Sequence, residues 1–362
     1  MRRIAICNTS IEPGDAVSTD MLGMYDVLAS SGYEVRLFAE ASSIENRKAE
    51  PLAQLDYFLE SPDDIFIYHY ATGWSQGMQL LKNLRCKKVV RYHNVTPSEF
   101  FEAVDSGYAG VCRAGRSMLA DLIKMKLDLY LANSAYSKCE LVQEGLEDHE
   151  CRVVPPFHQV DRLHKLDADL TELARYSDDM VNILTVGRLA PNKNHPALID
   201  AFSIYHNSYN PHSRLLIVGG DDIKLQSYTR SLRRKVRQLG LENSIIFTSK
   251  VSDAVLKALY LAADVFMTTS LHEGFCVPLV ESMSLKIPIV AFATTAVKET
   301  LGKAAIAWEE YDPELLAASI EKIMSEESLR VSLGHMGWLR YREAFTKGRI
   351  RQEFLEVLDS LL

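Results

Sequence analysis

The first half of the chain alternates between short apolar runs and longer segments with helical periodicity. Residues 18–30 form one such segment, and we expect Ser18 or Thr19 to cap its helix. Its apolar residues recur at the spacing of a helix with one buried face: Met21, Met24, Tyr25 and Leu28. This alternation is typical of parallel strands joined by helices. We predict strands in this half at 3–7, 34–38, 65–68, 88–91, 127–132 and 152–154.

The same alternation returns after a polar segment at 157–179 that has no strand pattern. We predict the linker between two domains there. Two amphipathic helices, at 321–343 and 349–361, are expected to follow the last strand. The sequence thus predicts two successive doubly wound α/β domains, which bind ligands at the carboxyl ends of their strands. The strands expected in the second half are 181–186, 214–218, 244–248, 264–268 and 287–291.

Composition excludes several classes of function. The chain has 362 residues, enough for two cores, and its formal net charge of −8 argues against a dedicated nucleic-acid binder. The six cysteines show no Cys-x-x-Cys pair and no zinc spacing, which indicates reduced thiols. No apolar run approaches the ~20 residues of a membrane-spanning helix. We expect a cytoplasmic protein. Peripheral contact with the inner membrane face, through basic helices, stays an open alternative.

The strongest chemical signal is SLHEGFCVPLVES at 270–282. It follows a predicted buried strand and precedes an apolar helix, with Pro278 suited to the first helical position. Backbone N–H groups at such a helix start bind anions, and Gly274 lets a ligand approach closely. Glu281, expected in the first helical turn, can accept two hydrogen bonds from a vicinal diol. A carboxylate that only stabilises the helix dipole is an equally good interpretation.

A second signal follows the predicted strand at 181–186, which ends at Gly187. Arg188 and Lys193 flank a short loop, and Pro196 opens the next helix. Two cations beside a helix start form a site for a diphosphate, because an arginine can bridge two oxygens and a lysine supplies a point charge. Two unrelated surface cations are the alternative interpretation.

Other strand ends carry weaker signals. Gly219 allows a tight turn, and the turn at 250–252 suits the edge of a nucleobase. The loop after the first strand contains Gly14 and Asp15 but lacks the G-x-G-x-x-G fingerprint of a dinucleotide cofactor. His93 directly follows the strand at 88–91, where a structural, hydrogen-bonded histidine is the simpler interpretation.

Together these motifs resemble the retaining family 4 of GT-B glycosyltransferases. The resemblance covers essentially the whole chain and rests on LANSAYSK, VGRLAPNKN and the Glu-x7-Glu pattern in EGFCVPLVE. It implies two Rossmann-like domains facing across a cleft, with an acceptor-binding domain at 1–165 and a donor-binding domain at 175–345. The helix at 346–362 would cross back to the first domain. The implied reaction moves a hexose, with retention and without a metal or other cofactor, from a UDP-sugar or GDP-mannose. The acceptor would be a glycan or a lipid-linked chain, in the synthesis of a cell-surface polysaccharide.

The resemblance also implies roles for individual residues. Arg188 and Lys193 would hold the donor diphosphate, and Glu281 would bind the ribose. His93 and Glu273 would lie at the transferred sugar. Further donor-binding positions are implied at Gly14, Asp15, Gly187, Gly219, Val251, Gly274, Phe275, Cys276 and Val277.

Some features of the family pattern differ here. Cys276 replaces a glycine, and Pro13-Gly14-Asp15 replaces a double glycine. No carboxylate is placed as a nucleophile, so retention rests on the resemblance. Two alternative functions are a nucleotide-sugar 2-epimerase of the same architecture and a non-catalytic nucleotide-sugar-binding protein.

Overall fold

The computed structural model describes residues 2–44 and 47–361, and the chain forms two compact units. The first unit comprises Met1–Ser98, Ala109–Gln159 and Thr346–Leu362, and the second comprises Glu99–Tyr108 and Val160–Phe345. Two segments therefore lie outside the unit to which the sequence assigned them. These are residues 99–108 and residues 160–165, both of which belong to the second unit.

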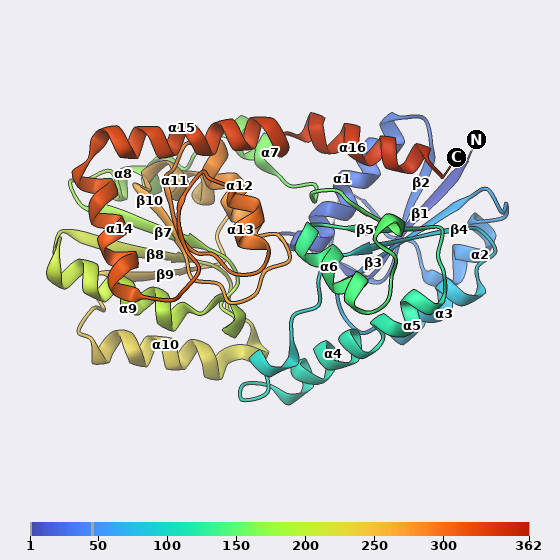
Figure 1. Ribbon diagram of the computed structural model, residues 1–362, viewed down its shortest axis with the longest axis horizontal. Coiled ribbons are helices and arrows are strands. Elements are labelled where there is room, and N and C mark those ends of the chain that lie inside the picture. Colours follow the sequence, from blue (N-terminus) through green and yellow to red (C-terminus); the bar gives the residue numbers. More distant parts are fainter. Residues whose placement is uncertain (1, 45–46, 362) are drawn as a thin grey trace. The chain divides into compact units, whose positions relative to one another are not determined.

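The first unit is built on a six-stranded parallel sheet of order β2-β1-β3-β4-β5-β6 (Figure 1). All six strands predicted for this half are confirmed, with ends that differ by a few residues. The strands are β1 (Arg3–Ile11), β2 (Glu34–Ser42), β3 (Ile65–Tyr70), β4 (Lys87–Tyr92), β5 (Leu129–Ala132) and β6 (Cys151–Val153). The helices are α1 (Ala16–Ser30), α2 (Leu55–Phe58), α3 (Ser75–Asn83), α4 (Ser106–Ser117), α5 (Leu119–Lys124), α6 (Ala135–Gln143) and α16 (Lys347–Asp359).

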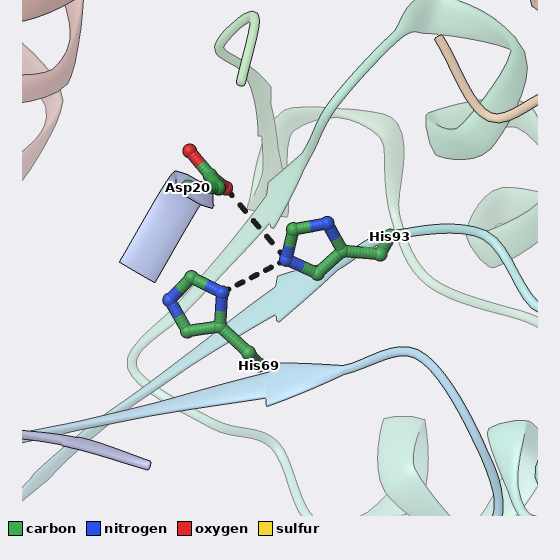
Figure 2. Close-up of side chains that lie close together, drawn as sticks. All are labelled: Asp20, His69 and His93. Atoms are coloured by element: carbon green, nitrogen blue, oxygen red, sulfur yellow. Dashed lines mark hydrogen bonds and ion pairs between the residues drawn. The ribbon is translucent and has the colours of Figure 1, made fainter. Parts of the chain in front are cut away.

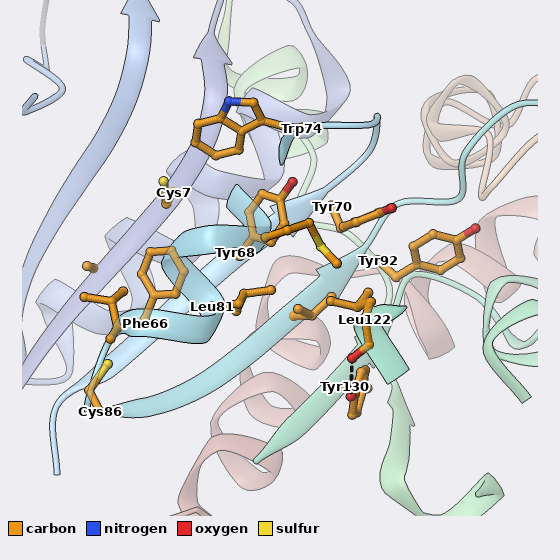
Figure 3. Packing of buried hydrophobic residues seen from close by; sticks show 14 of the residues in the cluster. Cys7, Phe66, Tyr68, Tyr70, Trp74, Leu81, Cys86, Tyr92, Leu122 and Tyr130 are labelled. Carbon is orange, nitrogen blue, oxygen red and sulfur yellow. Dashed lines mark hydrogen bonds between the residues drawn. The ribbon is translucent and has the colours of Figure 1, made fainter. Parts of the chain in front are cut away.

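Both faces of this sheet are covered, which explains why its strands read as continuous apolar runs. Ile4 and Ile6 pack with residues of α1 and α16 on one face. Ala5 and Cys7 belong to the cluster on the other face, together with residues of α3, α5 and α6. Figure 3 shows part of that second cluster, which is rich in tyrosine. Buried phenols of this cluster find acceptors: the Tyr70 hydroxyl donates to the Gly115 carbonyl at 2.5 Å, and the Tyr92 hydroxyl donates to Glu140 Oε2 at 2.8 Å.

The second unit has its own six-stranded parallel sheet, of order β12-β11-β10-β7-β8-β9. Its strands are β7 (Val181–Val186), β8 (Ser213–Val218), β9 (Ile245–Ser249), β10 (Val265–Thr268), β11 (Ile289–Phe292) and β12 (Ile306–Trp308). Its helices are α7 (Val160–Lys165), α8 (Leu170–Arg175), α9 (His195–Ser208), α10 (Gln226–Gln238), α11 (Asp253–Ala262), α12 (Val277–Ser284), α13 (Ala296–Leu301), α14 (Pro313–Ser325) and α15 (Glu327–Ala344). Ile183 packs with α9 and α14, and Leu184 packs with α11 and α12 on the opposite face. Both units are therefore three-layered α/β folds, as the pattern predicted.

Three predictions about this half need correction. The strand β12 was missed, because it is only three residues long. The predicted helix at 321–343 is two helices, α14 and α15, separated at Glu326, whose backbone is extended. The predicted linker at 157–179 contains α7 and α8, and its Val160 and Leu163 are buried in the core of the second unit.

The helix α16 belongs to the first unit, where Phe354 packs edge-on against Phe157 with ring centroids 5.8 Å apart. The Thr346 hydroxyl caps it by accepting from the Arg349 N–H. In the part of the chain that the structure describes, no helix has the length and apolar character needed to span a membrane.

Candidate functional site

The sheet of the second unit fixes where a ligand can bind. Its first strand, β7, lies between β8 and β10, so the strand order reverses between β7 and β10. Crevices for ligands form at such switch points, outside the carboxyl ends of the strands. The loop at 187–193 follows β7, and the loop at 270–273 follows β10. The fold therefore brings together the two strongest signals of the sequence.

A lysine and a glutamate from these two loops form an ion pair. Lys193 Nζ lies 2.5 Å from Glu273 Oε1, and the Ser270 hydroxyl donates to the same oxygen at 2.8 Å. Burial acts to lower the pKa of Lys193, but the Glu273 carboxylate outweighs it, so the pKa is raised and the ammonium group stays charged. The site thus holds a charged ammonium group, paired with the Glu273 carboxylate, at the end of β7.

Close contact between two strand ends shapes the floor of this site. A Cβ atom on Gly219 would lie 1.9 Å from the Gly187 carbonyl oxygen, so only glycine fits after β8. Gly187 has φ 153° and donates its N–H to the Val218 carbonyl at 2.8 Å. A Cβ on Gly187 would lie 3.7 Å from Lys193 Cε. Gly187, Gly219 and Lys193 are therefore neighbours, although the sequence separates them.

Arg188 lies at the rim of the same loop, and its side chain is 43% exposed. Its Nη1 is 3.5 Å from Asp222 Oδ2, and its guanidinium carbon lies 5.2 Å from the centre of the Tyr108 ring. The sequence predicted Arg188 but neither of these partners.

The turn at 273–277 leads into α12. Glu273 donates its N–H to the Thr295 hydroxyl at 3.0 Å, and the Thr300 hydroxyl donates to the Phe275 carbonyl at 2.7 Å. Cys276 has φ 74°, a left-handed conformation that favours glycine, and this is the position where the resemblance expects glycine. Burial raises the pKa of its thiol well above the usual range, so Cys276 stays protonated. Gly274 and Val277 belong to the same turn, and Val277 is the first residue of α12.

Glu281 occupies the second turn of α12, because the helix starts at Val277, and the expectation of a first-turn position is corrected. A helix-dipole role is thereby weakened, since that effect fades within the first turn. The Tyr260 hydroxyl donates to Glu281 Oε2 at 2.6 Å. Burial raises the pKa of Glu281, and the Tyr260 hydrogen bond opposes that shift. Val251, after β9, packs against the core cluster that contains Tyr260.

In the first unit, Asp15 caps α1, by accepting from the Ser18 N–H at 2.8 Å. The expected caps, Ser18 and Thr19, lie inside the helix instead. Gly14 precedes the cap with φ 79°, which the tight turn requires.

His93 belongs to a buried polar network that the sequence did not predict (Figure 2). Its Nε2 lies 2.8 Å from His69 Nδ1 and 3.6 Å from Asp20 Oδ2. Asp20 also accepts from Arg91 Nε and from the Phe157 N–H, both at 2.7 Å. Burial lowers the pKa of both histidines well below the usual range, and Arg91 lowers them further. Both imidazoles are therefore neutral at physiological pH.

Asp20, His69 and His93 offer ligand atoms within 4.8 Å of one another, as a metal site would. However, the Asp20 carboxylate already has two partners, one of them the fully buried Arg91 guanidinium. The positive charge of Arg91 already compensates the negative charge of the Asp20 carboxylate, as a metal ion would. The cluster therefore fits a hydrogen-bonded network better than a metal centre.

The residues that the sequence missed share one property. Ser270, Tyr260, Tyr108 and His69 are ordinary residue types in ordinary positions, and only tertiary contacts place them beside the predicted ones. His69 lies within an apolar strand, and that single polar interruption is the one signal that could have indicated it.

Two doubly wound units, the second with a charged site at its switch point, define the GT-B class of fold, and solved structures agree. The structure is similar to sucrose-phosphate synthase from Thermosynechococcus elongatus, with a TM-score of 0.78 and 18% identity over 100% of this chain and 99% of that one. It is also similar to Anabaena Alr3699/HepE in complex with UDP and glucose, with a TM-score of 0.74 and 19% identity over 99% and 100% of the two chains.

Within that class, residues 174–337 match the model of the family "Glycosyl transferases group 1", and these residues lie within the second unit. The mannosylfructose-phosphate synthase of Agrobacterium fabrum is 28% identical over 66% of this chain and 54% of its own length. O-antigen chain mannosyltransferase B of Escherichia coli is 28% identical over 41% and 38%. The chain thus spans about half or less of the length of these curated relatives. The comparisons therefore show a similarity to glycosyltransferases.

Proposed function

We propose that the protein is a retaining, metal-independent glycosyltransferase that moves a hexose from a UDP-sugar or GDP-mannose to a glycan or lipid-linked acceptor. The observation that carries the proposal is the Lys193–Glu273 ion pair at the carboxyl ends of β7 and β10. A permanently charged lysine at a ligand-binding switch point suits a diphosphate, and the adjacent carboxylate suits the hydroxyl groups of a sugar.

In the proposed reaction, the bond between the anomeric carbon and the β-phosphate oxygen breaks. The acceptor oxygen bonds to that carbon from the same face, and the acceptor proton passes to the departing phosphate. Negative charge grows on the β-phosphate as the bond breaks. Lys193 and Arg188 stabilise that charge, in the place where other transferases use a metal ion. Loss of one such donor typically costs about 10²–10³ in rate.

The other residues position the two ends of the donor. Glu281 accepts hydrogen bonds from the ribose hydroxyls, and Glu273 accepts from the hexose. His93, as a neutral imidazole, contributes a hydrogen bond at the transferred sugar. Retention and the absence of a metal cofactor rest on the family resemblance.

The names of similar proteins support the transfer of a sugar from a nucleotide-sugar donor, but they do not distinguish a UDP-sugar from GDP-mannose. HepE was crystallised with UDP and with UDP-glucose, whereas two of the relatives are O-antigen mannosyltransferases. Cell-surface polysaccharide synthesis is thus the proposed setting, with cytoplasmic localisation and peripheral membrane contact as parts of the proposal.

Nucleotide binding tests the proposal most directly. The melting temperature is measured with UDP, GDP and their common sugars, with and without EDTA. A ligand that binds only the folded state raises the melting temperature by mass action. We expect one base to do so in EDTA, and Lys193→Ala to abolish the shift. The exposed Lys303 provides the control, and Lys303→Ala should leave the shift unchanged.

Activity and stereochemistry follow from the donor so identified. Slow donor hydrolysis, with an anomer of unchanged configuration seen first by NMR, would agree with a retaining transferase. Inversion, or a requirement for a divalent metal, would contradict that part of the proposal. Binding without any turnover would favour a nucleotide-sugar-binding protein, and interconversion of the free nucleotide sugar would favour the epimerase.

A further inference from the structure

The segment Glu99–Tyr108 lies in the first half of the sequence, but it packs within the second unit. Its two ends bear aromatic rings that contact the candidate site. The Phe100 ring centre lies 6.1 Å from that of His272, the residue before Glu273. The Tyr108 ring centre lies 5.2 Å from the guanidinium carbon of Arg188. One short segment therefore contacts both loops of the switch point.

The segment holds its tyrosine firmly. Tyr108 lies in the first turn of α4, and its N–H donates to Asp105 Oδ1 at 2.6 Å, as in a helix cap. Its ring packs against Phe101 with centroids 4.3 Å apart, and Phe101 is fully buried. The position of the Tyr108 ring is thus fixed before any ligand arrives.

Arg188 has two partners, and they act differently on a ligand. Asp222 approaches a guanidinium nitrogen at 3.5 Å and so competes with phosphate for the N–H groups. An aromatic ring instead attracts the flat face of a guanidinium and leaves its N–H edge open for a bidentate contact. A long arginine side chain that is held in place loses less conformational entropy on binding.

We propose that Tyr108 is a positioning residue for the donor diphosphate, which orders Arg188 through its ring, and that segment Glu99–Tyr108 is thereby part of the donor site. This inference rests on the proposed function, because it requires Arg188 to contact the diphosphate. It predicts that the ring matters and the hydroxyl does not.

Calorimetric titration of the full chain with UDP and GDP, and with uridine and guanosine, provides the test. Tyr108→Leu removes the aromatic face and should weaken binding of the cognate nucleoside diphosphate by about 2- to 30-fold. The nucleoside, which lacks phosphate, should bind as before. Tyr108→Phe should bind the diphosphate within about twofold of the native protein. The exposed Tyr57 of the first unit supplies the control, and Tyr57→Leu should change neither affinity.

Two outcomes would overturn the inference. One is an unchanged diphosphate affinity in Tyr108→Leu, and the other is an equal loss for nucleoside and diphosphate, which would indicate a structural role.

A double variant separates an effect through Arg188 from a structural effect of Tyr108. With Arg188→Ala already present, Tyr108→Leu should add no further loss, because the coupled partner is gone. If Arg188→Ala alone does not weaken diphosphate binding, the proposed donor site fails as well. If it does weaken binding while Tyr108→Leu has no effect, only the inference fails.

Discussion

At the scale of single residues, the protonation state of Glu281 links its burial to ligand binding. An ionised carboxylate accepts stronger hydrogen bonds from a diol, through both of its oxygens, than the neutral acid does. Burial raises the pKa of Glu281 above its ordinary value of 4.5, so its acid form persists to higher pH than that of an exposed glutamate. The affinity for a nucleotide should therefore fall as the pH falls through this raised pKa.

We predict that Tyr260→Phe shifts this loss of affinity to higher pH. The Tyr260 hydrogen bond lowers the pKa of Glu281, so its removal raises that pKa further. Titration of UDP and GDP between pH 5 and pH 8 measures the effect. Each affinity is divided by that of Glu281→Gln at the same pH, which cancels the titration of the phosphates. A ratio that does not vary with pH in native protein would contradict a role for the Glu281 carboxylate.

The sequence identified the charged members of the site but not their partners. Lys193 and Glu273 were predictable because each charge follows a buried strand, where a doubly wound fold places its ligands. Their ion pair was not predictable, because the two residues lie 80 positions apart in the sequence. They meet only because β7 and β10 are neighbours in the sheet. The network around His93 was missed for the same reason, because Asp20 and His69 come from two other elements.

At the scale of elements, the backbones at the carboxyl ends of β7 and β8 lie so close together that a side chain on Gly219 would collide with Gly187. We predict that Gly219→Ala destabilises the second unit by about 1–3 kcal/mol, because the new Cβ would collide with the rigid Gly187 backbone. Gly220→Ala is the matched control. Its Cβ would meet Lys250 Cβ at an ordinary 3.6 Å, so its effect should stay within about 0.5 kcal/mol. Urea unfolding measures both. Equal stabilities of the two variants would show that the strand ends can move apart.

Elements were predictable wherever burial imposed a pattern. Strands such as β7 lie between two helical layers, so their apolar runs stand out in the sequence. The bounds of β7 were predicted to the residue, whereas the ends of other strands differ by a few residues. Helix ends depend on one or two polar contacts, and these are harder to predict. The Asp15 carboxylate caps α1 three residues before Ser18, the nearer of the two expected caps, and an extended Glu326 interrupts what reads as one helix. The three residues of β12 carry too little pattern for any prediction.

At the scale of the whole molecule, three histidines with lowered pKa values make stability depend on pH. Burial and the charge of Arg91 lower the pKa of His69 and His93, and burial with Lys193 lowers that of His195 to about 3. In the unfolded chain these groups have the ordinary pKa of about 6.5. Below pH 6.5 the unfolded chain therefore binds more protons than the folded one, and the free energy of unfolding falls as the pH falls.

The two units divide these histidines, which makes the prediction specific. His195 belongs to the second unit, and His69 and His93 belong to the first. We predict that His195→Gln reduces the slope of unfolding free energy against pH by up to about 1.4 kcal/mol per pH unit, and only in the second unit. The exposed His212 is the control, and His212→Gln should leave the slope unchanged. Urea unfolding between pH 5 and pH 6.5, followed by hydrogen exchange of peptides from each unit, separates the two transitions. A slope that His195→Gln leaves intact would mean that His195 takes up its proton in the folded state, and that its environment is more polar than its burial beside Lys193 implies.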